Sequence, residues 1–332
     1  MKLHLDQDAF RVLIEQISEK TGYRQDVIEK DYYVSMLLQE LSRFQMDGLP
    51  AYFKGGTALY KALHSIRRFS EDVDLSVDIR GCSRTQGDKR LERATKKYTC
   101  MERNTDEGRT NRSEVISYYR YLPVVEYDTE DVLQRFGKVK VEATSFTISE
   151  PYEPVVIAPL LYEQATRDQQ LILIQQFDVN PFEILTMTIE RIFIDKLFAA
   201  EAYTRQAEQA HRAFEASKHI YDLAVILDEQ RILSLLRDEK QLAKLLEIRL
   251  TEEKNRLDGI PGVLPKDFTF FDTACQNAHI KKAYETMQNQ YVLIPNERIS
   301  LDKARRQLFN LKEKLCQNPA WNLAEIPESN EK

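Results

Sequence analysis

The chain has 332 residues, a net charge of −6 and a hydrophobic content of 42%, which is enough apolar material for one large or two ordinary domains. No apolar run approaches the about 20 residues of a membrane helix, and the charged start MKLHLDQDAF is unlike a secretory signal. We therefore expect a cytoplasmic protein without a membrane anchor. The acidic balance also argues against a protein that coats nucleic acid.

Cysteine and histidine give no sign of a zinc site or a related metal site. The 4 cysteines are far apart and form no CxxC pair, and the 5 histidines show neither HxH nor HxxxH spacing. We expect free thiols and no structural transition-metal site.

The N-terminal region is predicted to begin with two amphipathic helices, over residues 7–20 and 24–44. A short strand then runs into Gly55 and Gly56, and a helix predicted over 57–64 follows these glycines directly. The turn therefore lies between the end of a strand and the first turn of a helix.

The next predicted strand, over residues 69–79, contains the sequence EDVDLSV. Val73 and Leu75 alternate with Asp72 and Asp74, and this period of two predicts one face in the core and one polar face. Both carboxylates should therefore leave the same face of the strand.

Residues 80–112 are rich in arginine and lysine and almost free of aliphatic side chains. We predict a helix followed by a loop. Taken alone, the segment is either a solvated insertion or a surface that follows phosphates.

Further strands are predicted over 115–125 and 137–148, after which the pattern becomes mainly helical. Several prolines over 151–159 interrupt the chain. We therefore predict two domains, a core over residues 1–150 and a mainly helical C-terminal domain over 151–332.

The paired aspartates suit divalent cations. Two carboxylates on one strand face can hold a pair of Mg²⁺ ions about 3.5 to 4 Å apart, the arrangement used for displacement at phosphorus. Taken alone, Asp72 and Asp74 fit solvated side chains on an edge strand better than a metal site. The turn at Gly55 and Gly56 favours the metal-site interpretation, because backbone N–H groups can approach phosphates there and Thr57 adds a hydroxyl.

Taken together, the stretch GGTALYKALHSIRRFSEDVDLSV resembles the signature of the AbiEii/AbiGii toxin family, within the polymerase-β-like nucleotidyltransferase superfamily. The segments VIEKDYYVSMLL, ERIFIDKLFAA and KHIYDLAVIL are also similar to that family, so the resemblance covers residues 25–230. It implies an α+β fold, with a polymerase-β-like core of a mixed sheet flanked by helices. A mainly helical C-terminal domain would follow and close the active-site cleft.

The resemblance also implies an activity. Family members transfer a nucleotide monophosphate from an NTP, with the tRNA acceptor end as the best-supported acceptor, and occur beside a separately encoded antitoxin. Magnesium would serve as cofactor, as two ions of which one arrives with the NTP. Gly55, Gly56, Thr57 and Ser70 would bind the nucleotide. Independently of the resemblance, we hypothesise that phosphorylation of Ser70, two positions before Asp72, places negative charge beside the carboxylates and silences the enzyme. Transfer to a protein side chain and a catalytically silent NTP- or RNA-binding module are the alternatives.

A third carboxylate is expected to complete the metal site. Glu142 lies on the polar face of its predicted strand, where the resemblance implies that it joins Asp72 and Asp74 as a metal ligand and takes the proton from the attacking hydroxyl. Lys140 shares that face, so an ion pair is the alternative for Glu142.

Two catalytic candidates come from the C-terminal half. Lys196 falls on the apolar stripe of its helix, where an inward lysine needs an anion; the resemblance suggests the NTP phosphates, and a stem that reaches out to solvent is the alternative. Asp222 lies in the apolar segment HIYDLAVIL, which the matching family motif places in the cleft. An ordinary helix pair with Lys218 is the alternative.

The sequence does not decide the roles of the charged residues close to the glycine turn. Lys61, Arg67 and Arg68 either contact phosphate or RNA, or are solvated helix charges. The cluster over residues 29–31 either supports the turn or is an exposed helix face.

Overall fold

The structure is a computed structural model that describes residues 1–127, 136–255 and 263–325. The chain divides into two units, each described by itself. The sheet unit comprises Met1–Leu63 and Phe69–Met187, and the helical unit comprises His64–Arg68 and Thr188–Lys332. The units thus meet in sequence at 187 and not at 150, because two strands that follow residue 150 belong to the sheet.

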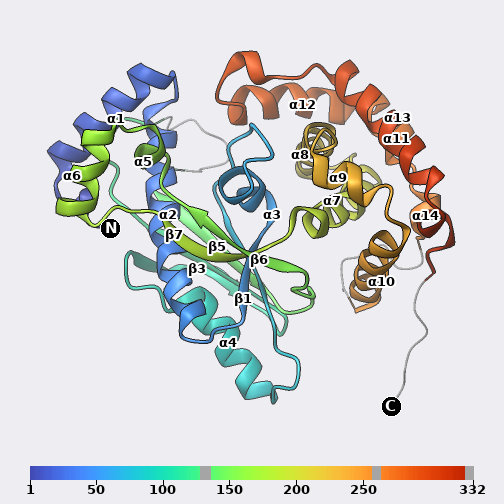
Figure 1. The fold of residues 1–332 in the computed structure, drawn as a ribbon, viewed down its shortest axis with the longest axis horizontal. Helices are drawn as coiled ribbons and strands as arrows, with labels where there is room; N and C mark the ends of the chain where they lie inside the picture. Colours follow the sequence, from blue (N-terminus) through green and yellow to red (C-terminus); the bar gives the residue numbers. More distant parts are fainter. Residues whose placement is uncertain (128–135, 256–262, 326–332) are drawn as a thin grey trace. The chain divides into compact units, whose positions relative to one another are not determined.

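The sheet unit is built on a seven-stranded sheet of order β3-β4-β5-β2-β1-β7-β6 (Figure 1). Its strands are β1 (Ala51–Lys54), β2 (Val73–Val77), β3 (Glu102–Thr110), β4 (Glu114–Arg120), β5 (Lys138–Thr144), β6 (Tyr152–Ile157) and β7 (Phe182–Met187). Strand β2 runs parallel to β5 and β1 runs parallel to β7, whereas the other neighbours are antiparallel. The sheet is therefore mixed and the fold is α+β, as predicted.

Two edge strands differ from the sequence prediction. Strand β3 occupies residues predicted as a loop, and because most of its side chains are polar and exposed, it has no alternating apolar pattern. Strand β6 contains Pro154, which sequence reasoning took as an interruption. Proline is compatible with a strand at the edge of a sheet, where its missing N–H breaks no ladder.

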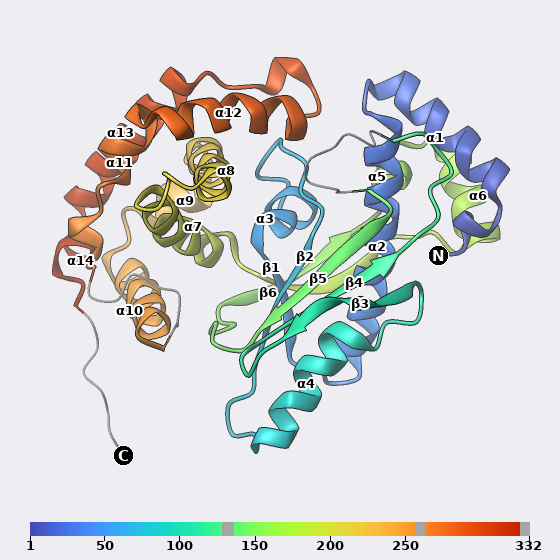
Figure 2. The ribbon, with the colours of Figure 1, turned by 180° about the vertical axis from the view of Figure 1, so that it is seen from behind.

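The helices of the sheet unit enclose charged residues as well as apolar ones. They are α1 (Gln7–Thr21), α2 (Gln25–Met46), α3 (Gly55–Thr57), α4 (Arg84–Lys96), α5 (Leu160–Gln164) and α6 (Arg167–Phe177), with short turns η1 (Leu3–Leu5) and η2 (Ala58–Ala62). Figure 2 shows α4 along the sheet, where it contacts β2, β4 and β5. Helix α2 contacts β2, β5 and β7.

The charged cluster over 29–31 is buried, so its interpretation as an exposed helix face is wrong. Asp31 accepts hydrogen bonds from the Lys61 ammonium at 2.7 and 2.9 Å and from the backbone N–H of Leu160 at 2.6 Å. Lys61 lies in η2, directly after the glycine turn, and is itself buried. The cluster thus holds the segment that follows the turn, and Lys61 is neither solvated nor free to contact RNA.

The helix predicted over 57–64 is shorter and differently wound. Its first turn is the three-residue α3, and η2 then continues as a π-helical turn that ends at Ala62. Widened turns of this kind are frequent at functional sites.

The helical unit contains α7 (Ile189–Thr204), α8 (Ala210–Ile226), α9 (Gln230–Leu235), α10 (Glu239–Asn255), α11 (Phe270–Thr273), α12 (Ala278–Tyr291), α13 (Leu301–Gln317) and α14 (Pro319–Leu323), with turns η3 (Pro265–Asp267), η4 (Ala274–Gln276) and η5 (Pro295–Glu297). Helix α8 is central, since it contacts α7, α12 and α13 (Figure 1). Among the described residues, no helix is long and apolar enough to cross a membrane.

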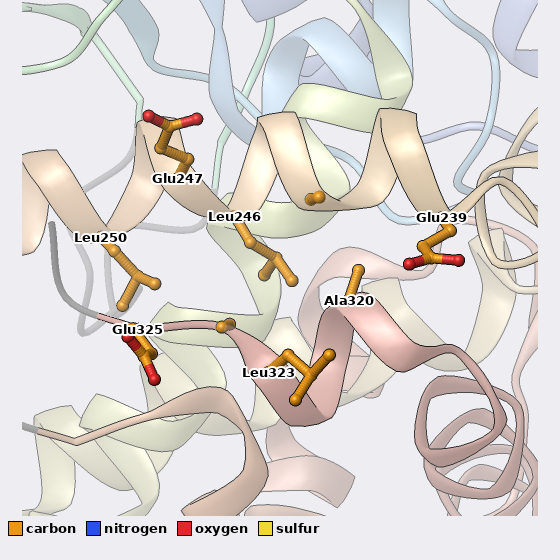
Figure 3. Close-up of a pocket in the computed structure, with 9 residues that line it drawn as sticks. Glu239, Leu246, Glu247, Leu250, Ala320, Leu323 and Glu325 are labelled. Carbon is orange, nitrogen blue, oxygen red and sulfur yellow. The ribbon is translucent and has the colours of Figure 1, made fainter.

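A pocket of about 260 Å³ lies between α10 and α14 (Figure 3). Leu246 and Leu250 of α10 point toward α14, which contributes Leu323, and the acidic residues Glu239 and Glu247 are also among the lining residues. It contains none of the residues predicted to form the active site.

Candidate active site

The carboxylates of the sheet unit meet through the register of two parallel strands. Asp74 on β2 lies directly opposite Glu142 on β5, and Lys54 on β1 lies opposite Asp74 from the other side. Directly opposed residues of neighbouring strands point to the same face of a sheet. Asp72 precedes Asp74 by two positions, so its side chain leaves from that face as well.

The glycine turn is packed against this face. Gly55 has a φ of +80°, and a β-carbon added to it would lie 2.4 Å from Oδ2 of Asp74. Such a separation is shorter than real contacts of a β-carbon, so any larger residue would have to displace the Asp74 carboxylate. The backbone of the turn therefore runs directly beside the Asp74 carboxylate, where a triphosphate could contact both.

Two predicted nucleotide-binding residues touch one another. The buried Thr57 hydroxyl is 3.0 Å from the Ser70 hydroxyl and donates a hydrogen bond to it. This contact joins the end of the glycine turn to the segment that leads into Asp72. Ser70 itself is half-buried.

Lys140 also belongs to the carboxylate face. Its ammonium lies 2.8 Å from Oε2 of Glu142 and 3.6 Å from Oδ2 of Asp72. The ion pair that was the alternative for Glu142 is therefore present, although it joins two residues of one strand. Lys140 bridges Glu142 to Asp72, which directly precedes the neighbouring strand β2.

The close carboxylates have unequal proton affinities. Burial, and after it the nearby charge of Glu142, raise the pKa of Asp74 to about 6. Burial also disfavours ionised Glu142, but the Lys140 ammonium outweighs it and holds the pKa of Glu142 below its usual range. The pKa of Lys140 is raised by Asp72, Glu142 and Asp74 against the effect of burial, so the lysine is positively charged.

These residues fit a divalent cation in an open site. Carboxylate oxygens are the donors that Mg²⁺ prefers, and a cation would relieve the repulsion that raises the pKa of Asp74. Within the described residues, no group of three or more histidine, cysteine, aspartate or glutamate side chains is placed so that it could hold a metal ion. Magnesium usually keeps water and substrate phosphates among its ligands, so an incomplete protein set is what it requires.

Lys196 and Asp222 meet in the helical unit. The Lys196 ammonium is 2.8 Å from Oδ2 of Asp222, and Arg68 donates to both oxygens of Asp222 at 2.7 Å. Asp222 is fully buried, which by itself would raise its pKa, yet the charges of Arg68 and Lys196 hold the pKa well below the usual range. The three side chains form a buried charge cluster, which we call the Asp222 cluster.

The Asp222 cluster settles two open alternatives. Lys196 is buried, as its position on the apolar stripe predicted, and does not reach out to solvent. Lys218 pairs with Glu215 at 2.7 Å, so it does not explain Asp222. The anion beside Lys196 in this structure is Asp222, and phosphate binding by Lys196 stays a prediction.

Arg68 was not predicted as a partner of Asp222. Its guanidinium is buried, so the interpretations of Arg68 as a solvated charge and as an RNA contact are both wrong. Arg67, next to it, is exposed and lies 3.8 Å from Glu297. No local pattern could reveal the Arg68 pair, because its two residues are 154 positions apart.

The predicted residues therefore form two groups. Asp72, Asp74 and Glu142 gather in the sheet unit together with the glycine turn. Lys196 and Asp222 gather in the helical unit with Arg68.

The comparisons with known proteins connect this arrangement to a family. Residues 37–309 match the family described as "Nucleotidyl transferase AbiEii toxin, Type IV TA system". The chain belongs to this AbiEii family. It is accordingly a nucleotidyltransferase of a toxin family, and the resemblance drawn from its motifs is confirmed.

Solved structures give matches at low identity. JHP933 from Helicobacter pylori is 16% identical, with a TM-score of 0.38, over 89% of this chain and 95% of that chain. MenT4, a nucleotidyltransferase toxin from Mycobacterium tuberculosis, is 16% identical, with a TM-score of 0.42, over 92% of this chain and 98% of that chain. A search of curated proteins gave no significant match. The family match, and not these neighbours, carries the assignment of the AbiEii protein.

Proposed function

We propose that this AbiEii protein is a magnesium-dependent enzyme that transfers a nucleotide monophosphate from an NTP to the 3' end of an RNA, with the tRNA acceptor end as its acceptor. The observation that carries the proposal is the facing pair of Asp74 and Glu142 beside the tight backbone of Gly55. Family membership supplies the reaction class. A cytoplasmic location fits these substrates.

Different residues of the sheet unit bind different parts of the nucleotide and its metal. Backbone N–H groups of Gly55 and Gly56 face the triphosphate, and the hydroxyls of Thr57 and Ser70 support the turn. Asp72 and Asp74 would hold magnesium, which bound there neutralises charge on the phosphates. Positive charge placed before the reaction begins stabilises the negative charge that develops at phosphorus.

Glu142 is suited to accept the proton of the attacking hydroxyl. Its neighbour Lys140 keeps it ionised, which is the form that can accept a proton. The RNA 3' oxygen forms a bond to the α-phosphorus while the bond from that phosphorus to the bridging oxygen breaks. Pyrophosphate leaves with the electron pair of the broken bond, and the hydroxyl proton passes to Glu142.

The surface of α4 and β3 supports RNA as the acceptor. Exposed Arg84, Lys89 and Arg112 lie in or beside these elements, within the basic segment noted in the sequence. Basic side chains outside the reacting centre contribute sequence-independent contacts to phosphates. A cognate antitoxin encoded nearby is the partner that fits the family description.

The decisive experiment supplies the purified full chain with Mg²⁺, each of the NTPs labelled at the α-phosphate, and either total tRNA or total protein. We expect label in tRNA from one NTP and its loss, by at least about 100-fold, in an Asp72→Asn/Asp74→Asn variant. Label in protein would support the protein-acceptor alternative. Binding of NTP without transfer to either material would support the silent module, and turnover in the double variant would refute the catalytic assignment.

A further inference from the structure

We propose that Lys140 takes the place of one of the two metal ions of the expected site, so that the protein binds a single divalent ion together with its NTP. The inference rests on the proposed function, because it concerns the same carboxylates. It departs from the two-ion expectation drawn from sequence.

The position of Lys140 is the first observation. Its ammonium lies 2.8 Å from Glu142 and 3.6 Å from Asp72, so it stands between a carboxylate of β5 and one that directly precedes β2. An ion bound by both carboxylates would need their oxygens at about 2.0 to 2.1 Å. That ion and the ammonium would compete for the same oxygens and repel one another.

The strand geometry is the second observation. Lys140 and Glu142 are two positions apart on β5 and share a face, whereas Asp74 lies on β2 and Asp72 directly precedes that strand. The register pairs Asp74 with Glu142, which brings Lys140 beside Asp72. Since only 27% of the Lys140 side chain is exposed, its position between the carboxylates is built into the sheet.

The remaining ligands are enough for one ion. Of the three carboxylates described, Asp72 and Glu142 form ion pairs with Lys140, and Asp74 does not. Asp74 faces the glycine turn, where the phosphates would lie. Lys54, which lies opposite Asp74, donates to the hydroxyls of Thr144 and Thr147 at 2.9 and 3.1 Å. A metal that arrives with the NTP can therefore use Asp74 and Oδ1 of Asp72, because the Lys140 ion pair is with Oδ2 of Asp72, while Lys140 supplies the second positive charge beside Glu142.

The number of bound ions tests this directly. The full chain is saturated with a non-hydrolysable NTP whose α,β-bridging oxygen is replaced by a methylene group, and bound Mn²⁺ is counted by electron paramagnetic resonance during titration. We expect one Mn²⁺ per chain for the wild type and two for Lys140→Met. The matched control is Lys138→Met. Lys138 lies on the same strand and the same face as Lys140, but its ammonium pairs with Glu107 at 2.9 Å. This variant should still bind one Mn²⁺ ion.

The outcomes separate this inference from the proposed function. Two Mn²⁺ ions in the nucleotide-bound wild type would overturn the inference and leave the proposed function intact. One ion in a folded Lys140→Met variant that still binds the nucleotide would also overturn it. Lys140→Gln, which keeps a polar side chain, serves if the methionine variant does not fold. Absence of nucleotide binding by the wild type would overturn the proposed function and the inference together.

Discussion

Gly55 lies so close to Asp74 that a single added carbon atom on the glycine would be 2.4 Å from the carboxylate oxygen. The turn proposed to bind the phosphates and the residue proposed to bind the metal therefore lie side by side. A change in one must move the other.

The variant Gly55→Ala should lose at least about 10-fold in nucleotide transfer, because the new methyl group must push the Asp74 carboxylate aside. It should also lose about 1 to 2 kcal/mol of stability, because alanine is strained at a φ of +80°. Activity assays and urea unfolding measure the two effects. Gly48→Ala is the matched control, since Gly48 has a φ of +81° and open space around it. It should lose stability alone, and equal activity losses in the two variants would contradict the contact.

The Asp222 cluster predicts an asymmetry between its members. Asp222→Ala leaves the buried Arg68 and Lys196 without their shared anion and should cost about 3 to 5 kcal/mol of stability. Lys196→Met keeps the two hydrogen bonds from Arg68 to Asp222 and should cost less. Urea unfolding of both variants measures these losses. Lys218→Met is the control, because Lys218 lies on α8 together with Asp222 but pairs with Glu215. A smaller loss for Asp222→Ala than for Lys196→Met would be inconsistent with this cluster.

Glu29 predicts a pH dependence of stability. Burial raises the pKa of Glu29 to about 7 from its ordinary 4.5, even though the Val124 N–H donates to the carboxylate at 2.7 Å. The unfolded chain therefore loses this proton at lower pH than the folded chain, and stability falls as pH rises from about 4.5 to 7.

Glu29→Gln removes this titration. Between pH 5 and pH 8, the free energy of unfolding of the variant should rise relative to that of the wild type, by about 3 kcal/mol at most. Urea unfolding at both pH values measures it. A difference that does not change with pH would show that Glu29 titrates normally.

Ser70 predicts sensitivity to negative charge. Its hydroxyl accepts from Thr57 at 3.0 Å, just before Asp72. Ser70→Asp adds a carboxylate near Asp72 and Asp74 and should lower NTP affinity and transfer by at least about 10-fold. Ser70→Ala, which removes only the contact with Thr57, should keep most of the activity. Full activity of Ser70→Asp in the transfer assay would end the idea that phosphorylation here silences the enzyme.

The sheet unit's part of the site could be predicted because its information is local. Asp72 and Asp74 share a face through the period of a strand, and Lys140 and Glu142 do so on another. The glycine turn lies next to β1 in sequence, so strand, turn and DxD strand follow one another within a short segment. Short-range periodicity was sufficient for these residues.

The pairing of Arg68 with Asp222 and the burial of the charged cluster over residues 29–31 could not be predicted in this way. Arg68 and Asp222 are separated by 154 positions, and their pairing depends on tertiary packing. The burial of Asp31 likewise depends on Lys61 and on the backbone of Leu160, from different parts of the chain. The polar edge strand β3 lacked an apolar pattern because few of its side chains are buried.

The order in which the chain enters the two units limits how homologous genes can recombine. The helical unit takes His64–Arg68 from the middle of the sheet unit's sequence, so the chain passes from one unit to the other three times. Recombination that replaced everything after residue 187 would import a new Asp222 and Lys196 but keep the old Arg68. Residues 64–68 must therefore be inherited together with the distant C-terminal helices, although they are encoded beside the DxD strand.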